Sequence, residues 1–122
     1  MSEFNSNIPI YIQVIEHMKM DIISGKLKPG DKIPSVRELA LLLSVNPHTI
    51  QKALSELERE GFLITERAVG RYVSNNDELI NKSKDIEINK RIDNFIKEMK
   101  GLGLSLSDIK KYIDDIEEGE HE

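Results

Sequence analysis

The chain contains no cysteine and no long apolar run. Without cysteine it can form neither a disulfide nor a reactive thiolate, and nothing in its composition points to secretion. The first residues, MSEFNSNIPIYIQ, include neither a basic leader nor a continuous apolar segment, and no stretch approaches the roughly 18 to 20 apolar residues of a membrane span. We therefore expect a cytoplasmic protein with no membrane partner.

Residues suited to catalysis or metal binding are few and scattered. The three histidines, His17, His48 and His121, lie far apart, and no Ser/His/Asp or metal-ligand spacing accompanies them. The sequence EGEHE at residues 118–122 is more typical of a solvated, charged chain end than of a metal site. We predict that the protein is not an enzyme and uses no metal or cofactor.

An excess of negative charge is confined to the C-terminal part. The formal net charge of −5 argues at first against nucleic acid as a partner. Residues 1–76, however, contain 9 Lys or Arg and 9 Asp or Glu, whereas residues 77–122 contain 8 and 13. A phosphate-binding surface needs local cations rather than a basic protein as a whole. Any DNA is therefore expected to face away from the acidic part.

Two apolar patterns with the spacing of amphipathic helices open the chain. The first pattern ends at Gly25. Residues 26–31 then form a turn, because Pro-Gly cannot continue a helix. The second begins at Ser35, which forms an S-x-x-E capping box with Glu38. The apolar positions of the two helices are Tyr11, Val14, Ile15, Met18 and Ile22, and then Val36, Leu39, Ala40 and Leu43.

A third helical pattern follows after a few residues and is marked at both ends. Asn46 is a suitable N-cap, Pro47 occupies the first helical position, and Gly61 ends the helix. Its buried side is expected to consist of Ile50, Ala53, Leu54 and Leu57. A longer helix followed by two short helices joined by a tight turn predicts a helix–turn–helix.

A β-hairpin is predicted directly after the third helix. Residues 62–65 and 71–74 are β-prone, and residues 66–70 join them. So small a hairpin must pack on the helices, which is the position of a wing over about residues 62–74. Arg67 and Arg71 flank Gly70 at the expected tip, where glycine lets the main chain come close to the DNA backbone or minor groove.

Two further apolar stripes lie within residues 77–122, on helices separated by a break at residues 101–103. The first helix could begin as early as Asp77, and Ser105 with Asp108 caps the second. Two helices totalling about forty residues cannot bury both stripes by themselves. We predict that the stripes form a homodimer with the same segment of a second copy; the alternative is packing on the first helix of the same chain. The predicted dimerisation residues are Ile88, Ile92, Phe95, Ile96, Met99, Ile109, Tyr112, Ile113 and Ile116.

The polar side of the third helix is suited to double-stranded DNA. His48, Thr49, Gln51 and Lys52 lie in the first turn and a half, the part that reaches base edges in the major groove. Gln can pair with adenine, Lys with guanine, and Thr with phosphate or a thymine methyl. Arg37 in the preceding helix could grip a phosphate or a base. Alternatively, these are ordinary surface residues, with Arg37 paired to an acidic neighbour.

Three stretches resemble the signature of GntR-type transcriptional regulators: LKPGDKIPSVRELA at 27–40, VNPHTIQKAL at 45–54 and ELEREG at 56–61. The N-P-x-T variant and the short tail are similar to the YtrA subgroup. This resemblance implies a winged-helix homodimer that binds an inverted-repeat operator, usually as a repressor. Carried over by position, the DNA contacts fall on Ser35, Arg37, Asn46, His48, Thr49, Gln51, Lys52 and Gly70.

The sequence departs from the family pattern at two places. Pro47 stands where most of the wider family has an arginine, so the base contact of that arginine is not transferred. The wing commonly reads G-x-G, whereas this chain has Ala68-Val69-Gly70, which leaves the depth of wing insertion open.

The sequence as a whole predicts a mainly α-helical fold with a small β-hairpin (α+β). Residues 1–76 form a winged helix–turn–helix DNA-binding domain, and residues 77–122 form a helical dimerisation segment. Two recognition helices (about residues 47–60) spaced about 34 Å apart would contact successive major grooves of a palindromic operator. The alternative function is a winged-helix module for protein–protein interaction, which the acidic net charge and the altered wing would favour. A small-molecule effector stays unidentified.

Overall fold

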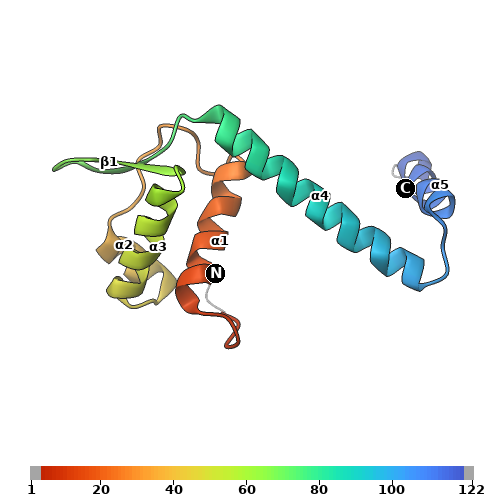
Figure 1. Cartoon of the computed structure of the whole chain (residues 1–122), viewed down its shortest axis with the longest axis horizontal. Helices are drawn as coiled ribbons and strands as arrows, with labels where there is room; N and C mark the ends of the chain where they lie inside the picture. Colours follow the sequence, from red (N-terminus) through yellow and green to blue (C-terminus); the bar gives the residue numbers. More distant parts are fainter. Residues whose placement is uncertain (1–3, 120–122) are drawn as a thin grey trace. The chain divides into compact units, whose positions relative to one another are not determined.

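The computed structural model describes residues 4–119, which form five helices and one β-hairpin. Figure 1 shows α1 (Ile10–Ile23), α2 (Val36–Leu43), α3 (Pro47–Arg59), β1 (Leu63–Glu66), β2 (Gly70–Val73), α4 (Asp77–Gly101) and α5 (Leu106–Gly119). The chain divides into two compact units, one up to residue 84 and one from residue 85. The predicted fold class, mainly α with a small hairpin, is confirmed.

The starts of α2 and α3 are fixed by the caps that the sequence predicts. The Ser35 hydroxyl accepts a hydrogen bond from the Glu38 N–H (3.1 Å), and the Glu38 carboxylate accepts one from the Ser35 N–H (3.1 Å). At α3, the Asn46 side chain accepts from the His48 N–H (2.8 Å), and Pro47 is the first helical residue. These bonds satisfy donors that a helix start leaves without partners.

The turns after α2 and α3 both depend on a left-handed residue. Ser44 ends α2 with φ 55°, and Val45 N–H donates to the Ala40 carbonyl (3.0 Å). Gly61 ends α3 with φ +91°. There the Phe62 N–H reaches the Leu57 carbonyl (2.9 Å), in the double hydrogen-bond pattern of a Schellman motif. This pattern turns the chain directly into β1.

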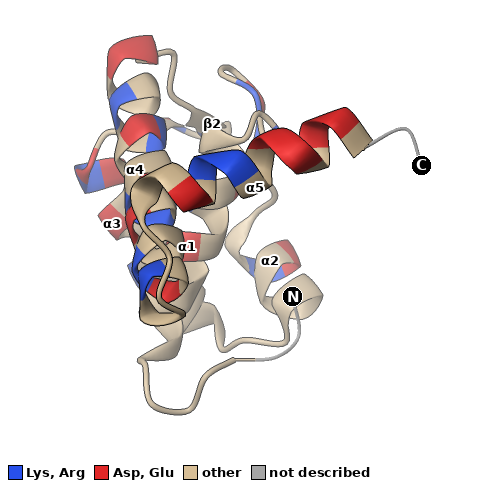
Figure 2. Ribbon diagram, turned by 90° about the vertical axis from the view of Figure 1, so that its right-hand side faces the viewer, with Lys and Arg blue, Asp and Glu red and all other residues tan. Residues whose placement is uncertain are grey.

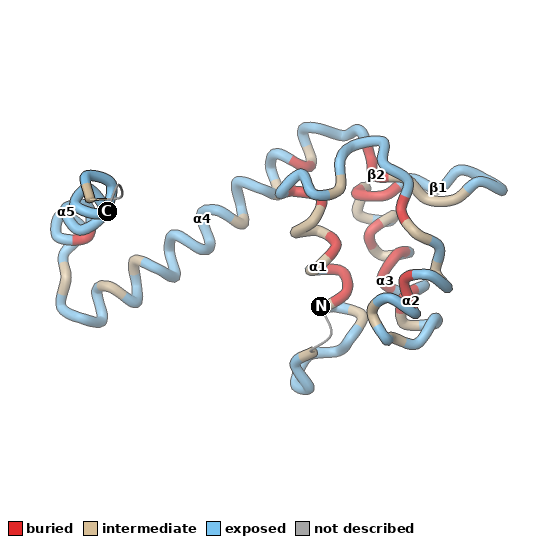
Figure 3. The backbone as a smooth tube through the Cα atoms, turned by 180° about the vertical axis from the view of Figure 1, so that it is seen from behind, coloured by how far each residue is buried: buried red, intermediate tan, exposed pale blue. Residues whose placement is uncertain are grey.

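The first unit is held together by the apolar side of α3. Figure 3 shows buried residues on α1, α3 and the strands. The predicted apolar positions Ile50, Ala53, Leu54 and Leu57 are all 0% exposed and pack against Val14, Ile15, Met18 and Ile22 of α1, Leu39 and Ala40 of α2, and Leu63 and Val73 of the hairpin. Each predicted helix therefore contributes the predicted face to one core.

The hairpin gains a third, very short strand that the sequence pattern does not predict. β1 and β2 are antiparallel, with Leu63 opposite Val73 and Glu66 opposite Gly70, one residue away from the predicted strand limits. In addition, Lys32 forms an isolated antiparallel bridge with Tyr72. A single bridged residue has no periodic signature, so the sequence pattern gives no sign of a strand after the turn at residues 26–31. The bridge ties the base of the wing to the segment before α2.

The start of α4 belongs to the first unit. Ile80 is buried in its core, so the compact unit extends into α4, whereas the sequence pattern places the boundary after residue 76. Among the described residues, the core of the first unit includes none beyond Ile80. In the second unit, the Ser105 hydroxyl accepts from the Asp108 N–H (3.1 Å), and Asp108 accepts from the Ser105 N–H (2.9 Å), as predicted.

We expect Leu54→Ala to destabilise the protein strongly. Leu54 is fully buried, so truncation removes apolar contacts and leaves a cavity, which costs about 2 to 5 kcal/mol of unfolding free energy. Urea unfolding followed by circular dichroism measures this cost. Leu41→Ala is the matched control, because Leu41 is 77% exposed and its loss should change the unfolding free energy by less than about 0.5 kcal/mol. Equal effects of the two changes would contradict this view of the core.

The capping box of α2 should make stability dependent on pH. The hydrogen bond from the Ser35 N–H lowers the pKa of Glu38 below its ordinary value, and that of the Ser35 side chain adds to it. A lowered pKa means that the stabilisation is complete above the ordinary pKa of a glutamate and is lost as pH falls through the lowered pKa. Glu38→Gln, which keeps a side-chain acceptor, should therefore flatten the acid limb of thermal stability against pH. An acid limb identical to that of the unmodified chain would show that the cap does not titrate.

Candidate nucleic-acid interface

The outer side of α3 is polar and accessible along its first two turns. His48, Gln51 and Lys52 are exposed, whereas Thr49 is half-buried. The Gln51 amide donates to the Ser55 hydroxyl (3.2 Å), so it lies along the helix surface. Because the inner side is completely buried, α3 cannot rotate, and these polar residues are held outward together.

Lys52 has a neighbour that sequence reasoning did not assign to the site. Its ammonium nitrogen lies 3.9 Å from the centre of the Tyr11 ring, a cation–π distance. Tyr11 is half-buried and packs against the core, so the ring is a fixed surface beside α3. Its helical spacing indicates only a core position for Tyr11, and no sequence signal could reveal the contact with Lys52.

The N-terminus of α2 presents Ser35 and Arg37. Ser35 is engaged in the capping box, although its hydroxyl hydrogen can still be donated. Arg37 is exposed and forms no ion pair within residues 4–119. The alternative pairing of Arg37 with an acidic neighbour is therefore not observed. Asn46 acts as the N-cap of α3 through its side-chain oxygen, which leaves its amide group to donate elsewhere.

The wing carries one arginine in its turn and another in its strand. Arg67 is exposed in the turn between Glu66 and Gly70. Arg71 lies in the predicted strand, opposite Thr65 and one residue pair from the turn, and its side chain is only 19% exposed, so it is less accessible than the expected position at the tip implies. Its Nε is 3.9 Å from Glu58 of α3, which also accepts a hydrogen bond from the Thr65 hydroxyl. Arg71 therefore joins the wing to α3.

One departure from the family pattern lies in the turn of the wing. Ala68, which stands where the first glycine of G-x-G is usual, adopts φ 63°. Glycine takes this left-handed conformation freely, whereas an alanine there is strained. The backbone shape that favours glycine is thus kept without the glycine.

The cations of the first unit differ in their partners. Lys19 pairs with Glu60 (2.8 Å), Arg59 pairs with Glu56, and Arg71 lies near Glu58. In contrast, Arg37, Lys52 and Arg67 form no ion pair in the described chain, and the Lys52 ammonium lies over the Tyr11 ring. Figure 2 shows where Lys and Arg (blue) and Asp and Glu (red) lie along the ribbon, including the acidic stretches of α5. Of the four predicted DNA-binding cations, Arg37, Lys52 and Arg67 thus have no acidic partner within residues 4–119, whereas Arg71 lies near Glu58.

The second unit exposes a large apolar surface. Ile88, Ile92, Phe95, Tyr112, Ile113 and Ile116 are between 42% and 70% exposed. An apolar groove of about 520 Å³ runs between α4 and α5, lined by Phe95, Met99, Leu102, Leu104, Ile109, Tyr112, Ile113 and Ile116. Of the other predicted dimerisation residues, Ile96 and Met99 are half-buried, and Ile109 is buried, with 3% exposure.

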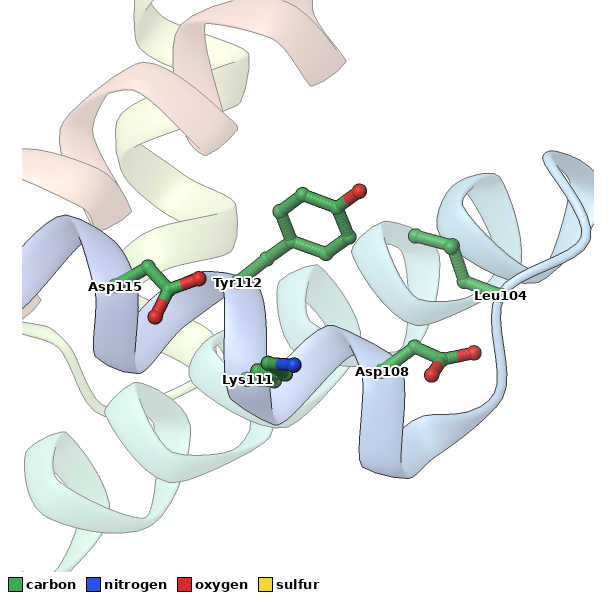
Figure 4. A pocket seen from close by; sticks show the side chains of 5 residues that line it. All are labelled: Leu104, Asp108, Lys111, Tyr112 and Asp115. Carbon is green, nitrogen blue, oxygen red and sulfur yellow. The ribbon is translucent and has the colours of Figure 1, made fainter.

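A polar hollow borders this groove on α5. Figure 4 shows it lined by Leu104, Asp108, Lys111, Tyr112 and Asp115. Leu104 and Tyr112 line both hollows, so the apolar surface passes directly into a charged edge. An apolar centre with a polar rim is the composition of protein–protein interfaces.

Neither a metal-binding group nor a spanning helix is found in the described chain. Within residues 4–119, no three His, Asp or Glu side chains are grouped to hold a metal ion. His17 contacts Asp21 (3.5 Å) one helical turn away, and His121 lies outside the described residues. No described helix is both long and apolar enough to cross a membrane.

Two curated relatives are similar to this chain in sequence. The uncharacterized HTH-type transcriptional regulator YhcF of Bacillus subtilis is 37% identical over 118 residues, which cover 97% of this chain and 98% of YhcF. The HTH-type transcriptional repressor YtrA of the same organism is 54% identical over 71 residues, 58% of this chain and 55% of YtrA. The similarity to YhcF thus includes the second unit, whereas the similarity to YtrA covers about half of each protein.

Solved structures and a family model give the same result. A GntR family transcriptional regulator from Listeria monocytogenes superposes with a TM-score of 0.79 at 36% identity, covering 92% of this chain and 98% of that one. The structure of AraR(DBD) in complex with operator ORE1 has a TM-score of 0.54 at 34% identity, covering 61% and 93%. The model of bacterial regulatory proteins of the gntR family matches residues 10–73. The chain therefore belongs to the gntR family of transcriptional regulators.

Proposed function

We propose that this protein is a sequence-specific repressor that binds an inverted-repeat operator as a homodimer. The observation that carries the proposal is the division of α3 into a fully buried apolar side and an exposed side with His48, Gln51 and Lys52. In this proposal the exposed side enters the major groove, where Gln and Lys can pair with adenine and guanine. Such a regulator acts on the chromosome, and hence in the cytoplasm.

The remaining predicted residues hold the DNA backbone around α3. Arg37 and the Ser35 hydroxyl lie at the start of α2, and Thr49 and the Asn46 amide lie at the start of α3, where they can donate to phosphates. Arg67 brings a cation to the tip of the wing. The AraR(DBD) structure, which covers 61% of this chain, is named as an operator complex, and YtrA is named a repressor. Both names support the DNA-binding and repressing roles proposed here.

The second unit supplies the dimer interface in this proposal. Monomeric proteins rarely expose apolar surface as large as its groove and stripes, and charged residues border the groove. A second copy offers the same stripes, and a two-fold arrangement buries both sets at once. Two-fold symmetry also matches an inverted repeat, whose half-sites lie about one helical turn, roughly 34 Å, apart.

Lys52→Ala should weaken operator binding, because it removes a cation from the proposed base-reading side. The expected cost is about 1 to 3 kcal/mol for a base contact. Selection of genome fragments with purified protein supplies the operator, and fluorescence anisotropy of that labelled duplex measures affinity. Arg59→Ala is the control, since Arg59 lies at the far end of α3 and is neutralised by Glu56. Failure to enrich any fragment, together with recovery of a stable protein partner, would instead favour an interaction module.

Phe95→Asp should convert the dimer into a monomer. The change places a charge in the apolar groove, where pairing with a second copy would bury it without a partner. Analytical ultracentrifugation over a range of concentrations measures the association. Ile86→Asp is the matched control: Ile86 is equally apolar and 60% exposed, but it lines neither hollow and lies two residues from the stripe, on another side of α4. The proposed interface would be contradicted if the unmodified chain stayed monomeric, or if Phe95→Asp and Ile86→Asp weakened association equally.

A further inference from the structure

Lys32 is held beside the wing by its backbone. It forms the antiparallel bridge with Tyr72 of β2, and hydrogen bonds lie on both sides of it. The Ile33 N–H donates to the Arg71 carbonyl (3.0 Å), and the Val73 N–H donates to the Asp31 carbonyl (2.8 Å). The main chain at residue 32 therefore has a fixed position next to β2, unlike that of a lysine on an open loop.

The side chain of Lys32 passes over Gly70. A Cβ atom added at Gly70 would lie 3.1 Å from Cε and 3.9 Å from Nζ of Lys32. The distance to Cε is shorter than an ordinary van der Waals contact. The methylene stem thus occupies the space that a larger residue at position 70 would take. Gly70 also has φ +143°, which glycine tolerates best. The Nζ of Lys32 therefore lies beside the residue where the turn carrying Arg67 enters β2.

The side chain of Lys32 is held in place, but no ion pair within residues 4–119 neutralises its charge. The residue is exposed and forms no ion pair within residues 4–119. Glu38 lies near enough to feel its charge, but the Glu38 carboxylate already accepts the Ser35 N–H in the capping box. A lysine whose stem is packed and whose ammonium is accessible can bind an anion with little further loss of side-chain freedom.

We infer that Lys32 binds a backbone phosphate of duplex DNA beside the wing, and that Gly70 serves this contact by leaving room for the Lys32 stem. The inference rests on the proposed function and extends its contact set by one residue. It also changes the role of Gly70. The close approach that glycine permits is made by a lysine of the same chain, and the lysine in turn contacts the DNA.

Salt dependence tests this inference. The slope of log affinity against log salt becomes shallower by about 0.9 for each DNA phosphate that the protein no longer neutralises. Lys32→Met keeps the stem over Gly70 and removes only the charge, so its slope should be shallower by about 0.9, whereas Lys32→Arg should keep the original slope. The probe is the labelled duplex from the genome-fragment selection, measured by fluorescence anisotropy. Lys82→Met is the control, because Lys82 is an exposed lysine that belongs to α4 and not to the hairpin or to the segment bridged to it.

Gly70→Ala tests the role of the glycine, and the double variant with Lys32→Met separates an effect on Lys32 from the backbone strain that any side chain causes at φ +143°. The added Cβ requires the Lys32 stem to move, so the slope of log affinity against log salt should become shallower, as it does in Lys32→Met. The double variant Lys32→Met, Gly70→Ala should have a slope no shallower than that of Lys32→Met alone. If the unmodified chain binds DNA with a strong salt dependence but Lys32→Met retains its slope, the inference alone fails. If the unmodified chain shows no salt-dependent binding to any duplex, the proposed function fails and the inference with it.

Discussion

Burial of one side of α3 is the constraint on which the rest of the structure depends. Ile50, Ala53, Leu54 and Leu57 contact α1, α2 and the hairpin at once, so the three elements are positioned relative to α3 rather than to one another. Because none of the four is accessible to water, rotation of α3 would expose several apolar side chains at a cost of about 1.5 to 3 kcal/mol each. The direction in which the polar side chains point is therefore a consequence of core packing, not of their own interactions.

The sequence predicts those parts of the fold that have local, repeated signals. The caps at Ser35, Asn46 and Ser105 are short hydrogen-bonded patterns, and the structure contains all three. The apolar sides of α1, α2 and α3 follow from helical spacing alone. The bridge at Lys32, the burial of Ile80 and the ring of Tyr11 beneath Lys52 join residues distant in sequence, and periodicity contains no information about such pairs.

The candidate site shows the same division. The exposure of His48, Gln51 and Lys52 follows from the helix period, and the structure agrees. The surroundings of Arg71 do not, because its predicted strand gives no sign that Glu58 of α3 lies near its guanidinium group. A net charge of −5 is equally uninformative by itself, since what matters is which cations lack acidic neighbours. Ion pairing at Lys19 and Arg59, and its absence at Arg37 within residues 4–119, can be read only from a structure.

The left-handed backbone of Ala68 affects how many conformations the turn of the wing can adopt. A glycine at this position would sample many conformations when the wing is unbound, whereas a methyl group excludes most of them. The strain is incurred once, during folding, and the loop then has less entropy left to lose on association. A wing of this kind gives up some thermodynamic stability, and its turn has fewer conformations available than a turn with glycine at this position.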